Sequence, residues 1–283
     1  MNLGRTKLAI CLCALVTSAF ASPVIDDAVL EDKFAAGLTE PGVDGMSGKA
    51  AVAALSAADG KKVAIAAVAP VTGADYERLC RSVVVVGSVD FCKKCDEAHM
   101  GAISTGWIID PRGRIVTNYH VLEDKDAGEL GVMTSDGKVH PVRAVLAADR
   151  EGDAAIVEVD PRESELPALS LAKAASTGEA IRVVGHPDGR FYSLTEGIVS
   201  RVFSQRTSDE KESRNWVSVT ADYGVGSSGA PVLNGAGEVV GMVSSTATLL
   251  ADTDEGKQPE AGDVQMVFRD CVSVDTMRRL IAD

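Results

Sequence analysis

Three stretches of the chain carry side chains that together could perform acyl transfer. The first is the run Asp222–Leu233, DYGVGSSGAPVL, in which serines stand between glycines ahead of a short apolar strand. Glycine allows close backbone approaches that a side chain would block, so such a loop can aim two amides at one point. Ser228 is the candidate nucleophile, and the N–H groups of Gly226 and Ser228 are the candidate oxyanion donors. Taken alone, the run also fits an ordinary Gly/Ser turn.

A histidine and an aspartate upstream are the partners that a serine nucleophile needs. His120 ends the second strand of a predicted hairpin that turns at residues 110–113, DPRG, and Asp153 lies at the mouth of an apolar strand. Serine is a weak nucleophile until a base takes its proton. His120 would be that base, and Asp153 would fix the imidazole tautomer. The order His, Asp, Ser is the order of the chymotrypsin-type triad.

The elements expected around these residues are mostly short strands. Turn signals separate apolar, β-branched segments, which predicts an all-β barrel fold closed by a helix over residues 272–282. The expected strands cover residues 82–89, 104–109, 114–119, 133–145 (a hairpin), 154–159, 180–184, 193–203, 216–221, 239–245 and 264–268.

These motifs resemble those of the trypsin-like (chymotrypsin-fold) serine peptidases, and among them the HtrA/Deg-like group. The matching stretches are Gly106–Val121, Asp153–Ile156 and Gly226–Pro231. The resemblance runs from about Val83 to the C-terminal helix. It implies two six-stranded antiparallel β-barrels with the triad between them. It also implies hydrolysis of protein or peptide substrates through an acyl-enzyme, with no cofactor and no metal.

Two features bear on how far the resemblance extends. The chain ends directly after the predicted closing helix, so we expect no PDZ domain. Asp222 lies six residues before Ser228, where the trypsin branch has an acid at the base of its S1 pocket. That offset predicts substrate binding by Asp222 and a preference for Lys or Arg at P1. HtrA-like enzymes instead favour small aliphatic residues, and an aspartate before a turn is often only a cap.

The chain divides into three predicted segments. Residues 1–21 have the pattern of a signal peptide, with a basic start, an apolar run and an A-x-A site at 19–21. We therefore expect a secreted or periplasmic protein that leaves the membrane after cleavage.

Residues 22–75, rich in alanine, glycine and aspartate, are expected to be a low-complexity linker or pro-segment of low order. A helix packed on the main domain is the alternative. Residues 76–283 form the predicted peptidase domain.

Charge and cysteines limit the possible partners. The net charge of −13 argues against a nucleic-acid partner. An even number of cysteines beyond the signal favours disulfide bonds in an exported chain, with a pairing that the sequence leaves open. Cys92 and Cys95, with His99 four residues on, fit either a disulfide-pinned loop or a zinc site. The four cysteines are Cys80, Cys92, Cys95 and Cys271.

The sequence therefore predicts a secreted serine endopeptidase. One alternative is a catalytically silent binding protein on the same fold, although such a protein has no need of an intact triad. Another is a metal-binding module in which Cys80 joins the two cysteines and the histidine of the CxxC stretch.

Overall fold

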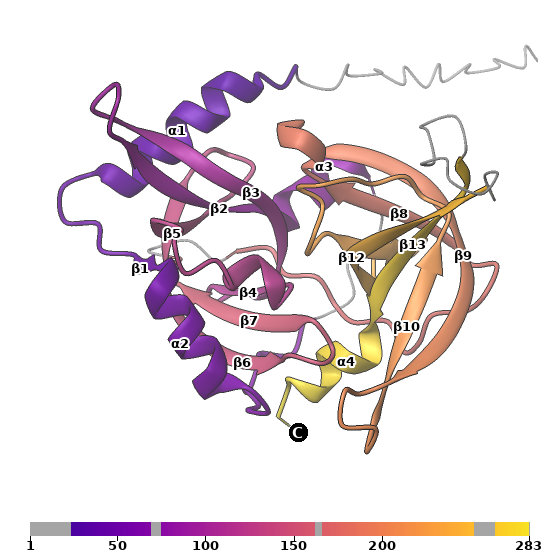
Figure 1. Cartoon of the computed structure of the whole chain (residues 1–283). Helices are drawn as coiled ribbons and strands as arrows, with labels where there is room; N and C mark the ends of the chain where they lie inside the picture. The colour runs from indigo at the N-terminus through magenta and orange to yellow at the C-terminus, as the bar shows by residue number, and fades with distance from the viewer. Residues whose placement is uncertain (1–23, 69–74, 162–165, 252–263, 283) are drawn as a thin grey trace, which may run out of the picture.

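The structure, a computed structural model, describes residues 24–68, 75–161, 166–251 and 264–282. Its strands form two closed antiparallel barrels that lie side by side, and a short helix follows the last strand (Figure 1). The predicted all-β fold of two six-stranded barrels with a C-terminal helix is confirmed. The predicted signal peptide, residues 1–21, lies outside the described residues.

The first barrel is built from the first half of the chain. Its strands are β2 (Val83–Cys92), β3 (Glu97–Asp110), β4 (Arg114–Thr117), β5 (Glu129–Met133), β6 (Val139–Asp149) and β7 (Ala154–Val159). They follow the order β5-β2-β3-β4-β7-β6, and pairing of β5 with β6 closes the barrel. A two-residue strand, β1 (Met46–Ser47), adds to β5. Val84, Ile108 and Ile115 are fully buried, as expected for branched side chains pointing into a small barrel.

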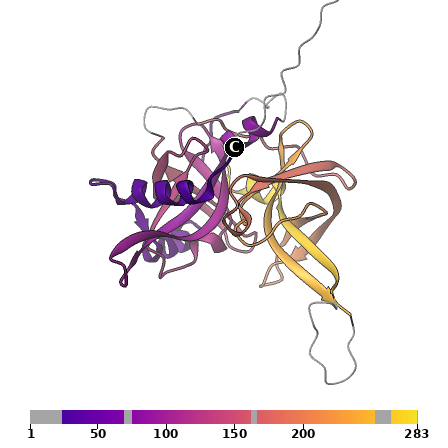
Figure 2. The ribbon, with the colours of Figure 1, turned by 90° about the horizontal axis from the view of Figure 1, so that it is seen from above.

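The second barrel uses the rest of the chain. Its strands are β8 (Ala180–Gly185), β9 (Ser193–Arg206), β10 (Ser213–Val219), β11 (Pro231–Asn234), β12 (Val239–Leu250) and β13 (Val264–Ser273). They close in the order β10-β13-β12-β11-β8-β9. The hairpin of β12 and β13 extends beyond the barrel (Figure 2). Helix α4 (Val274–Arg279) follows, within the range 272–282 predicted for a closing helix, and it buries Val274 and Met277.

The segment before the first barrel differs from the expectation of low order. It forms α1 (Asp27–Thr39) and α2 (Gly48–Ala58), which lie on the outside of the first barrel (Figure 1), and α3 (Tyr76–Ser82) leads into β2. Phe34 and Leu55 are fully buried. Helix α2 packs against the barrel through one leucine and small residues, so it buries few large apolar side chains. Tertiary contacts of this kind stabilise helices that lack a wide apolar stripe.

Beyond α2, the chain pairs first with β6 of the first barrel and then with the segment that follows α4. Asp59 forms a bridge with Ala148 of β6, and Val63 forms one with Ile281 after α4. The N–H of Val63 donates to the carbonyl of Leu280 at 2.8 Å. This part of the segment that was predicted to be a linker is therefore hydrogen-bonded to the body of the domain.

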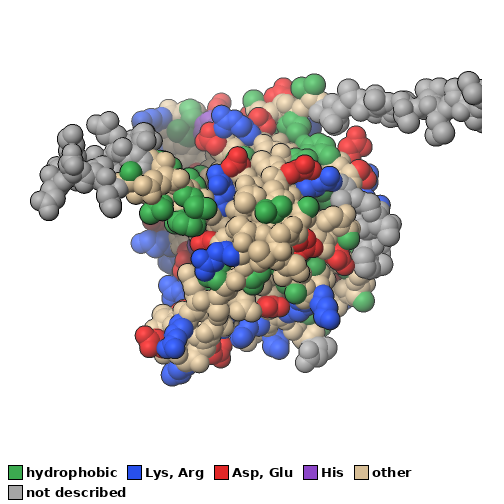
Figure 3. All heavy atoms as spheres, turned by 90° about the vertical axis from the view of Figure 1, so that its right-hand side faces the viewer, with side chains coloured by type: hydrophobic (Ala, Val, Ile, Leu, Met, Phe, Trp, Pro, Cys, Tyr) green, Lys and Arg blue, Asp and Glu red, His purple; other side chains and the backbone are tan. Residues whose placement is uncertain are grey.

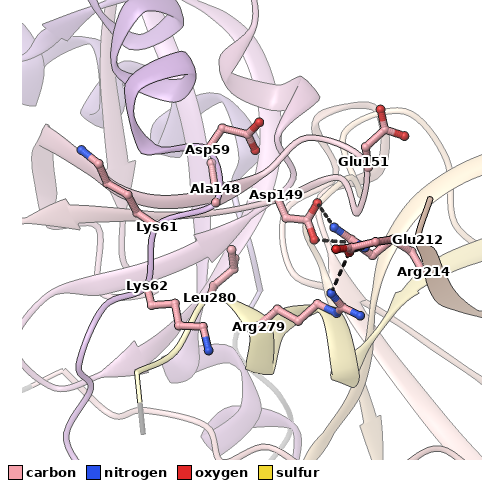
Figure 4. A pocket seen from close by; sticks show the side chains of 11 residues that line it. Asp59, Lys61, Lys62, Ala148, Asp149, Glu151, Glu212, Arg214, Arg279 and Leu280 are labelled. Atoms are coloured by element: carbon pink, nitrogen blue, oxygen red, sulfur yellow. Dashed lines mark hydrogen bonds and ion pairs between the residues drawn. The ribbon is translucent and has the colours of Figure 1, made fainter. Parts of the chain in front are cut away.

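A network of ion pairs joins the barrels on the side shown in Figure 4, where it lines a cavity of about 430 Å³. Arg214 of β10 contacts Asp149 of β6, with 2.7 Å between Nε and Oδ2, and both side chains are largely buried. Glu212 lies 2.7 Å from Arg214 and 3.2 Å from Arg279 of α4. The pair of Arg214 and Asp149 thus links the first barrel to the second.

Replacing Arg214 should destabilise the protein. In Arg214→Ala, Asp149 stays largely buried without its counter-ion, and breaking such a pair costs about 3 kcal/mol. Urea unfolding measures this loss. Arg206→Ala is the matched control, because Arg206 is 75% exposed and 3.9 Å from Glu210. Equal midpoints for the two variants would contradict the role of the inter-barrel pair.

Two further sequence predictions bear on the covalent state and the membrane. Cys80, Cys92, Cys95 and Cys271 all have free thiols, so the predicted disulfides are not present among these four residues. Among the described helices, none combines the length and apolarity needed to cross a bilayer.

Candidate active site

The loop that carries Ser228 connects β10 to β11 and is fixed by strand β3. The Thr105 hydroxyl donates to the carbonyl of Gly226 at 2.8 Å, and the Thr105 N–H donates to the carbonyl of Ser228 at 2.9 Å. Gly226 has φ 94°, and a Cβ there would collide with the carbonyl oxygen of His186. The left-handed backbone and the close approach together require glycine at this position.

Two amides of this loop are free to bind a ligand. The Ser227 N–H donates to the carbonyl of Gly224, and the Ala230 N–H donates to the carbonyl of Ser227, both at 2.9 Å. The N–H groups of Gly226 and Ser228, on either side of Ser227, have no hydrogen-bond partner among the described residues. Unpaired amides flanking a serine are what an oxyanion hole requires.

His120 and Asp153 meet at the rim of the first barrel. His120 begins a short 3₁₀ turn, η1 (His120–Leu122), just after β4, and Asp153 lies in the turn between β6 and β7. Nδ1 of His120 is 3.0 Å from each carboxylate oxygen of Asp153. The backbone N–H of His120 also donates to Oδ1, at 3.1 Å. The side-chain amide of Asn118 donates to the carbonyl of Asp153 at 2.9 Å, which holds this turn against β4.

Ser244 of β12 links this pair to the second barrel. Its hydroxyl donates to Oδ2 of Asp153 at 2.5 Å. The residue before it, Val243, accepts a hydrogen bond from the Gly229 N–H at 3.0 Å. Ser228 and Ser244 line the same cavity of about 200 Å³. The three residues predicted from the sequence therefore converge at the junction of the barrels.

One contact of an assembled triad is not formed in this state. Ser228 makes no side-chain hydrogen bond to His120 or to any other residue in the described part of the chain. In enzymes without bound substrate, such contacts are often long and tighten only when substrate binds.

Asp222 lies differently from the predicted S1 acid. Its carboxylate pairs with Arg269 of β13 at 2.5 Å, and its side chain is 78% exposed. The cavity beside Ser228 is lined instead by uncharged residues: Tyr223, Gly224, Val225, Val243, Ser244, Ser245 and Thr246. Arg269 thus pairs with Asp222, and Asp222 is not among the residues that line the cavity beside Ser228.

The two histidines nearest the loop have opposite electrostatic environments. The hydrogen bond with Asp153 raises the pKa of His120 above its ordinary value, against the effect of partial burial. Burial lowers the pKa of His186 to about 3. Nδ1 of His186 accepts the Tyr192 N–H at 3.0 Å, so this ring is neutral and structural. His120 alone of the two is suited to proton transfer near neutral pH.

Among the described residues, no cysteine hydrogen-bonds to His120, Asp153 or Ser228, although Cys271 contacts Tyr223 at 3.7 Å. Cys80 and Cys271 are buried, and burial raises their pKa values to about 11 and about 12. Cys92, Cys95 and His99 lie together at the tip of the hairpin of β2 and β3.

Sequence reasoning missed the residues that hold the site together. Thr105 and Ser244 bind the nucleophile loop and Asp153, respectively, but each stands next to another hydroxyl residue of its strand, and nothing in the sequence singles it out. Their partners are 121 and 91 residues away in the sequence. No local signal marks such contacts.

Comparison with known proteins shows what this part of the chain is similar to. Residues 104–242, which include His120, Asp153 and Ser228, match the family described as the trypsin-like peptidase domain. A protein of Pseudomonas savastanoi named "Probable periplasmic serine endoprotease DegP-like" is 31% identical over 147 residues, 52% of this chain and 30% of that protein. Serine endoprotease DegS of Haemophilus influenzae is 24% identical over 161 residues, 56% of this chain and 46% of its own.

Residues 104–242 are therefore similar to the trypsin-like peptidase domain, and the similar proteins are named as serine endoproteases. These findings confirm the resemblance to HtrA/Deg-like peptidases that was predicted from the sequence. The chain spans less than half the length of these relatives, 30% and 46% in the two cases.

Proposed function

We propose that this protein hydrolyses peptide bonds with His120, Asp153 and Ser228 as its catalytic triad. The observation that carries the proposal is the hydrogen-bonded pair of His120 and Asp153 beside a loop with two unpaired amides. Ser244 joins the two parts across the barrels. General base, nucleophile and oxyanion donors are thus supplied within one site.

The reaction follows from these positions. Ser228 Oγ attacks the carbonyl carbon of the scissile bond while Nε2 of His120 takes its proton. The N–H groups of Gly226 and Ser228 stabilise the oxyanion that forms. The C–N bond breaks, and His120 returns the proton to the departing amine. Water then cleaves the acyl-ester on Ser228, with His120 again taking and returning the proton.

The surface near the site favours extended, apolar polypeptide as substrate. Strand β12 lines the cavity as far as Thr246 and continues to an exposed apolar patch on the projecting hairpin (Figure 3). Its residues are Leu249, Leu250, Val264, Met266 and Phe268, from 36% to 52% exposed. Exposed patches of this kind mark interaction surfaces. With uncharged lining at the cavity, we propose small apolar residues at P1, in place of the Lys or Arg predicted from Asp222.

Location is part of the proposal. The signal pattern over residues 1–21 supports export, and a relative named as periplasmic agrees with it. We propose that the protein acts in the periplasm or outside the cell.

Cleavage mapping tests the function and the P1 preference together. The full chain is incubated with an unfolded protein and with a peptide library, and the new termini are sequenced. Cleavage after small apolar residues, absent with Ser228→Ala, is the expected result. Enrichment of Lys or Arg at P1 would restore the role predicted for Asp222. Cleavage that persists in Ser228→Ala would contradict the triad.

A silent binding protein is the second candidate, because the hydrogen bond between Ser228 and His120 is not formed in this state. It predicts that unfolded polypeptide binds to wild-type protein and Ser228→Ala alike, without new termini in either.

The raised pKa of His120 predicts the pH dependence of the proposed activity. His120 acts as a base only when neutral, so kcat/KM should fall as pH drops through its pKa, which the hydrogen bond with Asp153 raises above the ordinary value for histidine. An NMR titration of the four histidines in Ser228→Ala gives the same value independently. His186 is the internal control and should show no change near neutral pH. A His120 midpoint below the ordinary value would contradict the contact with Asp153.

A further inference from the structure

The tip of the hairpin of β2 and β3 brings three metal-ligating side chains together. The ligand atoms of Cys92, Cys95 and His99 all lie within 4.8 Å of one another, the one such group found in the described part of the chain. Sγ of Cys95 is 2.9 Å from Nε2 of His99. Tetrahedral zinc, with bonds of about 2.3 Å to sulfur and about 2.1 Å to nitrogen, needs its ligand atoms roughly 3.5–3.8 Å apart. Small side-chain movements would meet that requirement.

The backbone of the turn fixes this arrangement. Cys92 is the last residue of β2, and it pairs with Glu97, the first residue of β3. The Asp96 N–H donates to the carbonyl of Cys92 at 2.9 Å, and Asp96 has φ 61°, which reverses the chain direction. His99 lies two residues further along β3 from Glu97, and its ring reaches the two cysteine sulfur atoms. A four-residue turn and a strand register thus place all three ligands at one end of the hairpin.

The exposure of these side chains differs from that of the other described cysteines. Cys80 in α3 and Cys271 in β13 are buried, as is usual for structural cysteine. Cys95 and His99 are exposed and Cys92 is half-buried, so an ion from solvent can reach all three. The hairpin tip also precedes residues 104–242, the stretch that matches the peptidase family, and it contributes no residue to the proposed triad.

We propose that Cys92, Cys95 and His99 bind a Zn²⁺ ion at the hairpin tip, with a fourth position open to water or to another molecule. Two thiolates and an imidazole are ligands that zinc prefers over magnesium or calcium. Binding releases the two thiol protons to solvent and leaves the oxidation state of the sulfurs unchanged. This site replaces the earlier expectation that the chain binds no metal.

Metal titration of the full chain tests the site. Reduced protein, freed of metal by a chelator, is titrated with Zn²⁺, and bound zinc is counted after desalting. Co²⁺ is titrated in parallel, since thiolate coordination gives it a charge-transfer absorption in the near ultraviolet. The expected result is one ion per chain and that absorption. Both should be lost in Cys95→Ser and weakened in His99→Gln, two exposed positions whose replacement leaves the cores intact.

Matched variants separate this site from other thiols. Cys80→Ala removes a buried cysteine and should leave zinc binding unchanged. Lys93→Ala changes the turn without removing a ligand, and it should also leave zinc binding unchanged. Substoichiometric zinc in reduced wild-type protein would overturn the proposal. So would binding that survives in the double variant of Cys92→Ser and Cys95→Ser. Peptide mapping that finds Cys92 and Cys95 joined as a disulfide, in protein that binds no zinc after reduction, would also overturn it.

Discussion

Ser228→Ala is expected to lower kcat for peptide cleavage by about 10⁶-fold, the scale of loss seen when the nucleophile of a triad is removed. The variant keeps the backbone N–H groups of the loop and the pair of His120 and Asp153, so substrate still binds. It lacks only the oxygen that forms the acyl-ester. Single-turnover kinetics on a substrate identified by cleavage mapping measures the loss.

The neighbouring serine is the matched control for this prediction. Ser227 is 1% exposed and lies in the same loop, but its side chain makes no hydrogen bond to the proposed triad. Ser227→Ala should retain most of the wild-type kcat. If the two variants lose activity equally, the nucleophile is not Ser228 alone and the loop has been assigned wrongly.

Asp153→Asn should lower kcat by about 10⁴-fold, the effect found when the triad carboxylate becomes an amide in other enzymes of this kind. The carboxylate accepts both the ring and the backbone N–H of His120, and the neutral amide cannot hold the imidazole in the same tautomer. The raised pKa of His120 should also return toward its ordinary value, since its main cause is removed. Kinetics and NMR titration measure the two effects separately.

Ser244→Ala provides the comparison for this second prediction. It removes one hydrogen bond to Asp153 and leaves the charge in place. A loss of about 10-fold is expected, which corresponds to about 1.4 kcal/mol for a hydrogen bond to a charged group. If Asp153→Asn lost no more activity than Ser244→Ala, the carboxylate would be a structural group and not a member of the triad.

The sequence predicted the barrels and the loop of Ser228 because both depend on local patterns. Alternating apolar strands with turn signals specify a barrel, and glycines at fixed positions beside Ser228 specify a tight loop. Asp153 was harder to identify, since a single acid after a turn is common. It became a candidate only because a serine and a histidine of a triad need an acid as their third partner.

The features that sequence reasoning missed depend on contacts between distant segments. Helix α2 is held by a few small residues against β6, which no periodic stripe announces. The ion pair of Asp222 with Arg269 joins residues far apart in the chain. The sequence alone therefore gave no sign that the predicted S1 acid has a basic partner. The sequence likewise left open a disulfide or a metal site at Cys92 and Cys95, because the choice depends on how the turn places their sulfur atoms relative to each other and to His99.

Labelling with a fluorophosphonate probe tests the central claim most directly, because the probe reacts with a serine only when a neighbouring base activates it. The mature protein is labelled and digested, and the modified peptide is mapped, with Ser228→Ala as the control. We predict displacement of fluoride by Ser228 Oγ, a single adduct on Ser228, and no adduct in the variant. Folded wild-type protein that shows no adduct, or one on another serine, would contradict the proposed triad.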